Sequence, residues 1–552
     1  MLGRSDQITG LGPLPELGID DLYASVRARR TVPTWARAGH DAIDVVNELT
    51  LVVRRGRLVV IHTPLSDQVL RTWLRRFDKL YRYLPSAILR RTFHGDGKAV
   101  WLRGVHPRRD TKADSKTLGG RRVQKALDDD EDASYALSAA TIDHLPADEA
   151  ALVRGRLTVS PARSRVYWKY GIDLATYLAA VRETVDVLDK ALAVEPPDEL
   201  FPQLAIPETD LANVRGAYDL SIANVDEMFD RDETDDDLSA RAELLRGAIL
   251  EVIGRPDAAA FTVVVGHEGS EVGRLAIRPQ PRGDAFDLDV RLAGAPSWDD
   301  KVREVRDAIG DGDLLSVYYE SGHTYSEHQV NVEKQTAPPF ANLVFADFAG
   351  YRVTQEKPAA PNDQGIHDAI GRNGDTSLFA WVTRHYRGGW LVCDDGPGEV
   401  ADFLHLVDGT LTAIHVKGAN SASLDRRVSV TAYQEVVAQA EKNVRSLYGD
   451  HLVDRLTTPR SAPRAAWLDG ERIADLSGFV RELGRRTAVD RTRVEIVQPH
   501  LLRSVHDTAR AAADTASPTR DSRSLTLLDG LLRSARRSVT ALWDDLVVIG
   551  CE

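Results

Sequence analysis

The pattern of apolar and polar positions predicts both strands and helices throughout the chain. Two β-branched runs around a glycine turn predict a hairpin at 51–61 with arginines at its tip. Apolar residues recur at three- and four-residue spacing over 66–84 and 173–192, which predicts two amphipathic helices. The apolar runs 260–265 and 286–292 predict further strands. A multidomain α/β protein with N-terminal α+β units is therefore expected.

The last third of the chain has the densest pattern. Asp408-Gly409 is typical of a tight hairpin turn, and the glycines of 394–398 predict another turn before it. Three strands in a meander are therefore predicted, with a helix on either side. The expected segments are strands 390–394, 399–407 and 410–417, helices 377–386 and 433–447, and later strands 494–499 and 546–549.

Length and composition limit the class of protein. At roughly 100–200 residues per domain, 552 residues correspond to a few domains, and proline pairs suggest where they divide. We expect a basic α/β domain at 1–197, an acidic α+β domain at 198–350 and a third domain at 351–552. Two cysteines exclude a disulfide framework and a cysteine-based metal cluster, which favours a reducing cytoplasm. The sequence has no long apolar run or leader pattern, so neither membrane spanning nor secretion is expected.

The net charge of -13 conceals an uneven distribution. Residues 1–120 carry 21 basic and 12 acidic side chains, whereas the rest of the chain is strongly acidic. A basic segment of this kind can form a phosphate-binding surface that the whole-chain charge hides, although a solvated basic face would give the same count. The candidate nucleic-acid-binding residues are Arg54, Arg55, Arg57, Arg108, Arg109, Lys112 and Lys116.

Candidate catalytic chemistry lies in the predicted meander. His415 and Lys417 are two residues apart on one strand and so point to the same face, and the neighbouring strand brings Asp402 near them. A carboxylate that holds Mg²⁺ or Mn²⁺, beside a lysine that stabilises charge on phosphate, is suited to phosphodiester hydrolysis. The alternative is that Asp402 is a polar hairpin residue and that His415 and Lys417 form the solvent face of an edge strand.

The same residues resemble a known family. Asp402, twelve intervening residues and His415-Val-Lys417 resemble the core of the PD-(D/E)XK, or restriction-endonuclease-like, nucleases, with histidine in the usual acidic position. The segment 393–402, Cys-Asp-Asp-Gly-Pro-Gly-Glu-Val-Ala-Asp, is similar to the C-terminal module of bacterial defence-associated helicase proteins. The resemblance covers about residues 370–552.

The resemblance implies a restriction-endonuclease-like mixed sheet flanked by helices and a metal-dependent nuclease, with DNA favoured over RNA. It also implies that Asp402, His415 and Glu399 bind the metal, that Lys417 positions the nucleophile, and that Gln439 on the following helix orients the site. The chain has no nucleotide-binding P-loop, so a helicase or ATPase partner would be a separate subunit. The alternative function is a catalytically inactive nucleic-acid-binding or scaffold subunit of such a complex.

Overall fold

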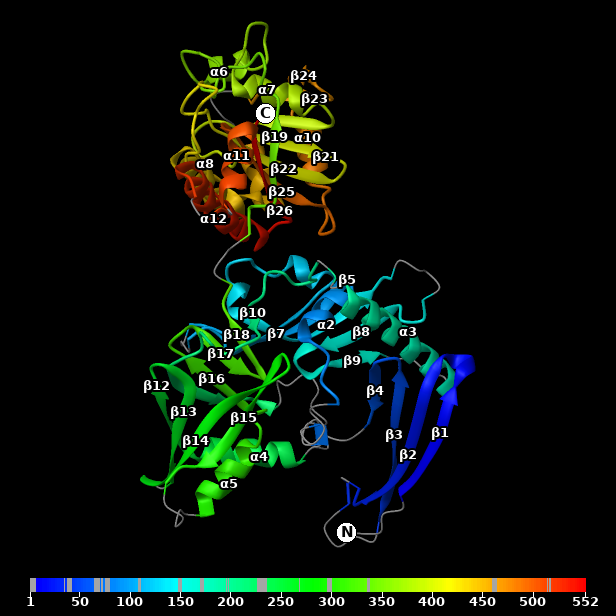
Figure 1. Cartoon of the computed structure of the whole chain (residues 1–552). Coiled ribbons are helices and arrows are strands. Elements are labelled where there is room, and N and C mark those ends of the chain that lie inside the picture. The colour runs from blue at the N-terminus through cyan, green and yellow to red at the C-terminus, as the bar shows by residue number, and fades with distance from the viewer. Residues whose placement is uncertain are drawn as a thin grey trace. The chain divides into compact units, whose positions relative to one another are not determined.

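The chain folds into two compact units, Met1–Thr336 and Ala337–Glu552. The computed structural model (Figure 1) describes residues 6–33, 35–36, 42–63, 70, 73–74, 80–107, 111–146, 151–168, 173–194, 196, 198–225, 236–267, 269–294, 300–334, 338–458, 464–513, 515 and 518–552. None of the helices in these ranges is long and apolar enough to cross a membrane. A domain boundary expected at 350 would fall inside the second unit, because β19 (Leu343–Ala346) pairs with β26 (Asp545–Cys551).

The described residues of the first unit form four antiparallel sheets. One sheet contains β1 (Asp6–Leu14), β2 (Ile19–Thr31), β3 (Asp44–Arg55) and β4 (Leu58–His62), and a second contains β6 (Ser115–Gly119), β5 (Gly95–Gly104), β7 (Tyr135–His144), β8 (Gly155–Ser160) and β9 (Arg165–Trp168). The third contains β10 (Ile206–Glu208), β18 (Gln329–Val332), β17 (His323–Ser326), β16 (Leu315–Tyr319) and β11 (Ala217–Ile222). The fourth contains β12 (Ile249–Arg255), β13 (Ala258–His267), β14 (Ser270–Arg282) and β15 (Ala285–Leu292).

The described helices of this unit are short except for one. They are α2 (Ser86–Thr92), α3 (Leu174–Ala193), α4 (Asp236–Gly247) and α5 (Asp300–Ile309), with 3-10 turns η1 (Pro15–Leu17), η2 (Val123–Lys125), η3 (Asp132–Ser134) and η4 (Pro161–Arg163). The predicted helix 173–192 is confirmed as α3, which begins where the Asp173 carboxylate accepts a hydrogen bond from the Thr176 N–H at 2.8 Å. The predicted hairpin 51–61 and the strands 260–265 and 286–292 are also confirmed. Most of the predicted helix 66–84 lies outside the described residues.

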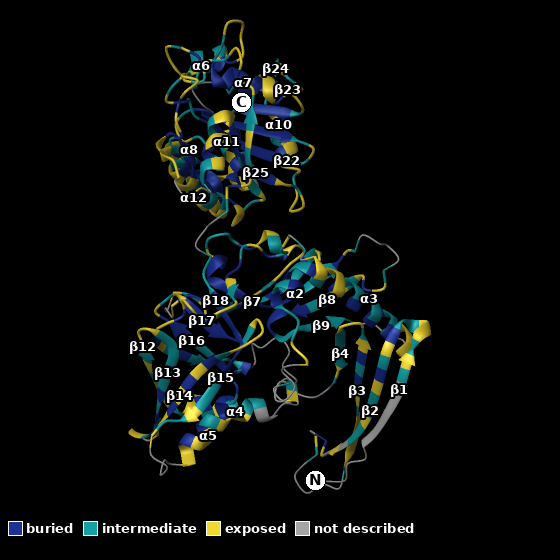
Figure 2. Ribbon diagram, viewed as in Figure 1, coloured by how far each residue is buried: buried dark blue, intermediate teal, exposed yellow. Residues whose placement is uncertain are grey.

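The second unit is built on one mixed eight-stranded sheet. Its strands lie in the order β19, β26, β25 (Thr492–Leu502), β22 (Thr410–Val416), β21 (Phe403–Val407), β20 (Trp390–Cys393), β23 (Ala466–Leu468) and β24 (Glu471–Ile473). The meander β20–β21–β22 is antiparallel, and β25 then adds to β22 in parallel. The middle strands are buried along nearly their whole length (Figure 2).

Helices cover both faces of this sheet. They are α6 (Asp363–Ala369), α7 (Leu378–His385), α8 (Thr431–Asn443), η6 (Val444–Leu447), α9 (Gly449–Thr457), α10 (Ser477–Leu483), α11 (Arg503–Ala513) and α12 (Arg520–Thr540). Apolar residues of α8, α9, α10 and α12 pack on one face in the larger hydrophobic cluster, whereas α7 packs on the other face in a smaller one. The predicted helices and later strands of the last third are confirmed. The mixed α/β class expected from the sequence is likewise confirmed.

One predicted strand is shorter than expected. The sequence predicted a strand from 399, but β21 begins only at Phe403. The buried Asp394 carboxylate accepts a hydrogen bond from the Val400 N–H at 3.1 Å and also binds Arg455 and Arg464, at 3.0 and 2.8 Å. These contacts hold residues 394–402 as a loop at the end of the sheet, because the Val400 N–H bonds to a side chain rather than to a neighbouring strand.

The two adjacent leucines of α12 provide a test of this packing. Leu528 is 1% exposed in the larger cluster, whereas Leu527 is 67% exposed. Leu528→Ala should lower the free energy of unfolding of the second unit by about 2–5 kcal/mol, because it removes buried methyl groups and leaves a cavity. Leu527→Ala, the control, should change it by less than about 0.5 kcal/mol. Urea denaturation followed by tryptophan fluorescence measures both, and equal effects would contradict the packing.

Candidate metal centre

Three carboxyl groups converge at one end of the meander in the second unit. Asp395 and Glu399 lie in the loop after β20, and Asp402 immediately precedes β21. One oxygen from each lies within 4.8 Å of the other two. Asp395 and Asp402 are buried, at 5% and 4% exposure, and Glu399 is half-buried. Oxygen donors grouped this closely are the ligands that Mg²⁺, Mn²⁺ and Ca²⁺ prefer.

Backbone hydrogen bonds fix these side chains in place. The Asp402 Oδ2 accepts a hydrogen bond from the Val416 N–H at 2.7 Å, and the Asp402 carbonyl accepts one from the Asp394 N–H at 2.9 Å. The Glu399 Oε2 accepts a hydrogen bond from the Gly396 N–H at 3.0 Å. Asp402 therefore joins the ends of β20, β21 and β22, and its carboxylate cannot move far without breaking the end of the meander.

Two lysines lie beside the carboxyl groups. The Lys357 Nζ is 2.6 Å from Asp395 Oδ1 and 3.7 Å from Glu356 Oε1. The Lys417 Nζ, just past the end of β22, is 2.8 Å from Glu435 Oε1 on α8 and 3.5 Å from Glu356 Oε2. Glu356 thus links the two ammonium groups. Five carboxyl groups and two lysines are therefore grouped at this end of the sheet.

The pKa shifts of this group follow from burial and from the neighbouring charges. Burial raises the pKa of Asp402 well above its ordinary value, and the charges of Glu399 and Glu356 raise it further. Burial also raises the pKa of Glu399, with a contribution from Asp395. Burial acts to lower the pKa of Lys357, but the hydrogen bond and charge of Asp395 outweigh it and raise that pKa. A bound cation would favour the ionised carboxylates and oppose these shifts.

His415 and Gln439 are not part of the cluster formed by Asp395, Glu399 and Asp402. His415 is buried at 3% exposure on β22, and burial alone lowers its pKa to about 4, so its imidazole is neutral at pH 7. Among the described residues, the groups of three or more ligand atoms within 4.8 Å of one another do not include it. Gln439 lies on α8 one turn beyond Glu435, which is the residue of that helix that contacts Lys417. The structure thus brings Asp402 and Glu399 together and places Lys417 nearby.

Sequence reasoning missed several residues of this site. Asp395 follows Asp394 in a predicted turn, where its role could not be distinguished from turn formation. Glu356 and Lys357 precede a proline-rich stretch far from the meander in sequence. Glu435 was on a correctly predicted helix, and its position one turn before Gln439 was the available signal.

The basic residues of the first unit are placed as follows. Each predicted arginine of the β3–β4 hairpin pairs with an aspartate: Arg54 with Asp21 at 2.5 Å, Arg55 with Asp186 at 2.6 Å and Arg57 with Asp189 at 2.7 Å. Lys112 donates to Ser134 Oγ at 2.8 Å, and Lys116 pairs with Glu131 and Asp132 at 2.6 and 2.8 Å. Arg108 and Arg109 lie outside the described residues. These pairs partly neutralise the surface on which nucleic-acid binding was expected.

Comparison of the chain with protein-family models, curated proteins and solved structures finds no match.

The raised pKa of Asp402 predicts that this residue lowers the free energy of unfolding of the metal-free chain as the pH rises. A carboxyl group whose pKa is higher in the folded state stabilises the fold fully below its unfolded pKa of about 3.9, and this contribution is lost as the pH rises through the folded pKa. Asp402→Asn stays neutral and can still accept from Val416. In chelator, the variant should therefore unfold at a higher denaturant concentration than wild type at pH 8, with the difference shrinking toward pH 4. Equal stability at pH 8 would show that folding does not raise the pKa of Asp402.

Proposed function

We propose that the second unit is a metal-dependent nuclease that hydrolyses phosphodiester bonds of nucleic acid. The observation that carries the proposal is the convergence of Asp395, Glu399 and Asp402 at the end of a meander whose last strand leads directly to Lys417. Buried carboxylates with a nearby lysine are the groups that phosphodiester hydrolysis requires. The order of elements supports it: α7, the β20–β21–β22 meander and α8 occur in the order that the resemblance to PD-(D/E)XK nucleases implies.

The carboxylates are assigned to metal binding. Asp395, Glu399 and Asp402 would hold Mg²⁺ or Mn²⁺, and the donor set fits because all three offer oxygen atoms within 4.8 Å of one another. A bound ion of this type would supply Lewis-acid stabilisation of the phosphate and activation of water. Lys357 balances part of the carboxylate charge through its contact with Asp395.

Lys417 is assigned to the substrate. The Lys417 side chain is 29% exposed, whereas Asp402 is buried, so Lys417 is accessible to a phosphate oxygen. Burial acts to lower the pKa of Lys417, but the hydrogen bond to Glu435 and the charge of Glu356 outweigh it, so the pKa is raised and the side chain stays charged at neutral pH. A fixed positive charge stabilises the negative charge that builds up on phosphate in the transition state. His415, being neutral and buried, is suited to holding the strand end rather than to charge stabilisation.

Cleavage of nucleic acid tests the proposal. The full chain, incubated with linear, supercoiled and single-stranded DNA and with RNA, should cut at least one substrate with Mg²⁺ or Mn²⁺ and none in EDTA. Lys417→Ala should slow cleavage by about 10²–10³-fold, the usual cost of removing one group that stabilises transition-state charge. Lys442→Ala, which removes an exposed lysine at the end of α8, is the control and should cleave like wild type.

Two results would contradict the assignment. Cleavage that survives Lys417→Ala would remove Lys417 from the reaction. Binding of nucleic acid without metal-dependent cleavage of any substrate would favour the alternative, an inactive binding or scaffold subunit.

Metal binding itself should stabilise the second unit. At a Mn²⁺ concentration about 100 times the dissociation constant, wild type should gain about 2.7 kcal/mol of unfolding free energy, because only the folded site binds the ion. Asp402→Asn should lose most of this gain. Asp408→Asn alters an exposed carboxylate at the other end of β21, at a left-handed position (φ 47°) that asparagine tolerates, and should keep it. Thermal unfolding with and without Mn²⁺ distinguishes these outcomes, and an equal gain in both variants would place the ion elsewhere.

A further inference from the structure

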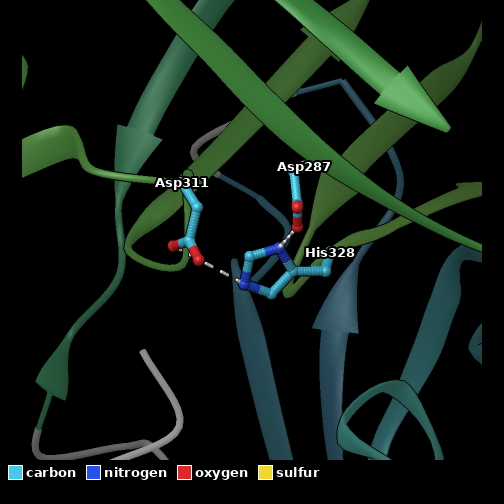
Figure 3. Close-up of side chains that lie close together, drawn as sticks. All are labelled: Asp287, Asp311 and His328. Atoms are coloured by element: carbon cyan, nitrogen blue, oxygen red, sulfur yellow. Dashed lines mark ion pairs between the residues drawn. The ribbon is translucent and has the colours of Figure 1, made fainter. Parts of the chain in front are cut away.

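A second group of potential ligands is buried in the first unit. Asp287 lies on β15, Asp311 follows α5, and His328 lies in the turn between β17 and β18. Their exposures are 5%, 2% and 2%, and one ligand atom from each lies within 4.8 Å of the other two. Figure 3 shows the imidazole between the two carboxylates, with Nδ1 toward Asp287 and Nε2 toward Asp311.

The backbone holds the three segments together independently of these side chains. The Phe286 N–H donates to the His328 carbonyl at 2.8 Å, and the Leu288 N–H donates to the Asp311 carbonyl at 2.9 Å. Asp287 lies between these two donors, so its neighbours bond directly to the backbone of both other ligands. A site with its segments fixed in this way is preorganised, because little reordering is needed to bring the side chains together.

The turn that carries His328 has an unusual backbone. Glu327 and His328 have φ values of 48° and 64°, a pair of left-handed residues that tight hairpin turns usually build from asparagine and glycine. Each such residue costs of order 1–3 kcal/mol unless its surroundings hold it. Glu327 is held by Ser138, whose hydroxyl donates to its carboxylate at 2.5 Å. The imidazole of His328 lies between Asp287 and Asp311 in this turn (Figure 3).

The imidazole has one nitrogen without a hydrogen bond. His328 Nδ1 lies 3.3 Å from the Phe286 carbonyl oxygen, 3.3 Å from Asp287 Oδ1 and 3.4 Å from the Tyr325 hydroxyl. His328 Nε2 has no hydrogen-bond partner and lies 3.9 Å from Asp311 Oδ1. Two atoms that bind one ion at about 2.1 Å each lie up to about 4.2 Å apart, so 3.9 Å fits a shared cation.

Charge also favours a cation at this position. The two carboxylates are buried among apolar side chains, and Arg282 pairs with the Asp287 Oδ2. A buried carboxylate is costly unless positive charge or hydrogen-bond donors lie near it. A divalent ion held by Asp287, Asp311 and the His328 imidazole would place positive charge beside both carboxylates.

We propose that Asp287, Asp311 and His328 bind a divalent transition-metal ion, for which Zn²⁺ is the first candidate. Imidazole nitrogen combined with carboxylate oxygen is a donor set that suits Zn²⁺, whereas Mg²⁺ and Ca²⁺ prefer oxygen alone. The ion ties β15, the segment after α5 and the β17–β18 turn into one core. This site does not depend on the nuclease proposal, because it lies in the other unit.

Metal content of the full chain tests the proposal. The Asp402→Asn chain is used as parent, so that the Asp395, Glu399 and Asp402 cluster of the second unit contributes little to the metal content. After incubation with Zn²⁺ and gel filtration, elemental analysis should find about one Zn²⁺ per chain in the parent. Asp311→Asn and His328→Asn, each added to the parent, should lose it. Asparagine is chosen at 328 because it tolerates the left-handed backbone.

A matched control is available on the same hairpin. His323 on β17 lies 3.7 Å from a single carboxylate, that of Glu208, so His323→Asn should leave the zinc content unchanged. Circular dichroism checks that each variant is folded. Substitution of Co²⁺ for Zn²⁺ gives a second readout in the parent alone, since a nitrogen- and oxygen-bound Co²⁺ absorbs visible light.

Two outcomes would overturn the proposal. A parent chain that retains no zinc and gives no Co²⁺ absorption has no metal site at these residues. Zinc that remains bound in both folded variants would lie at another site.

Discussion

The second unit is organised around the burial of negative charge at the end of its sheet. Carboxylates in a low-dielectric interior are stable only with opposite charges or hydrogen-bond donors nearby. Asp394 receives two arginines and the Val400 N–H, which shape the loop. The loop in turn brings Asp395 and Glu399 to Asp402. The positions of Lys357 and Lys417 follow from the same requirement, since each contacts carboxylates of this group.

Local pattern explains why the framework of this unit could be predicted from the sequence. The Asp408-Gly409 turn and the alternating apolar residues around it set the meander, and Asp402 and Lys417 follow from their places at its strand ends. Asp395 and Lys357 could not be found in this way, because their contact joins residues far apart in the chain. The environment of His415 was also hidden, since alternation gives the face of a residue but not the charges around it.

In the first unit, too, contacts between residues far apart in the chain could not be predicted from the sequence. The arginine-rich hairpin was predicted correctly, yet its arginines pair with aspartates of β2 and α3, two of which lie more than a hundred residues away. Sequence charge counts cannot reveal such pairs. The Asp287, Asp311 and His328 group escaped prediction for the same reason, because its three ligands come from three separate segments.

The position of a bound ion tests the central claim most directly. Crystals of the full chain soaked in Mn²⁺ and measured at the manganese absorption edge should show an anomalous peak within about 2.0–2.6 Å of oxygens of Asp395, Glu399 and Asp402. A peak there would establish these carboxylates as a metal centre. The absence of a peak at this position, with the three side chains ordered, would contradict the account.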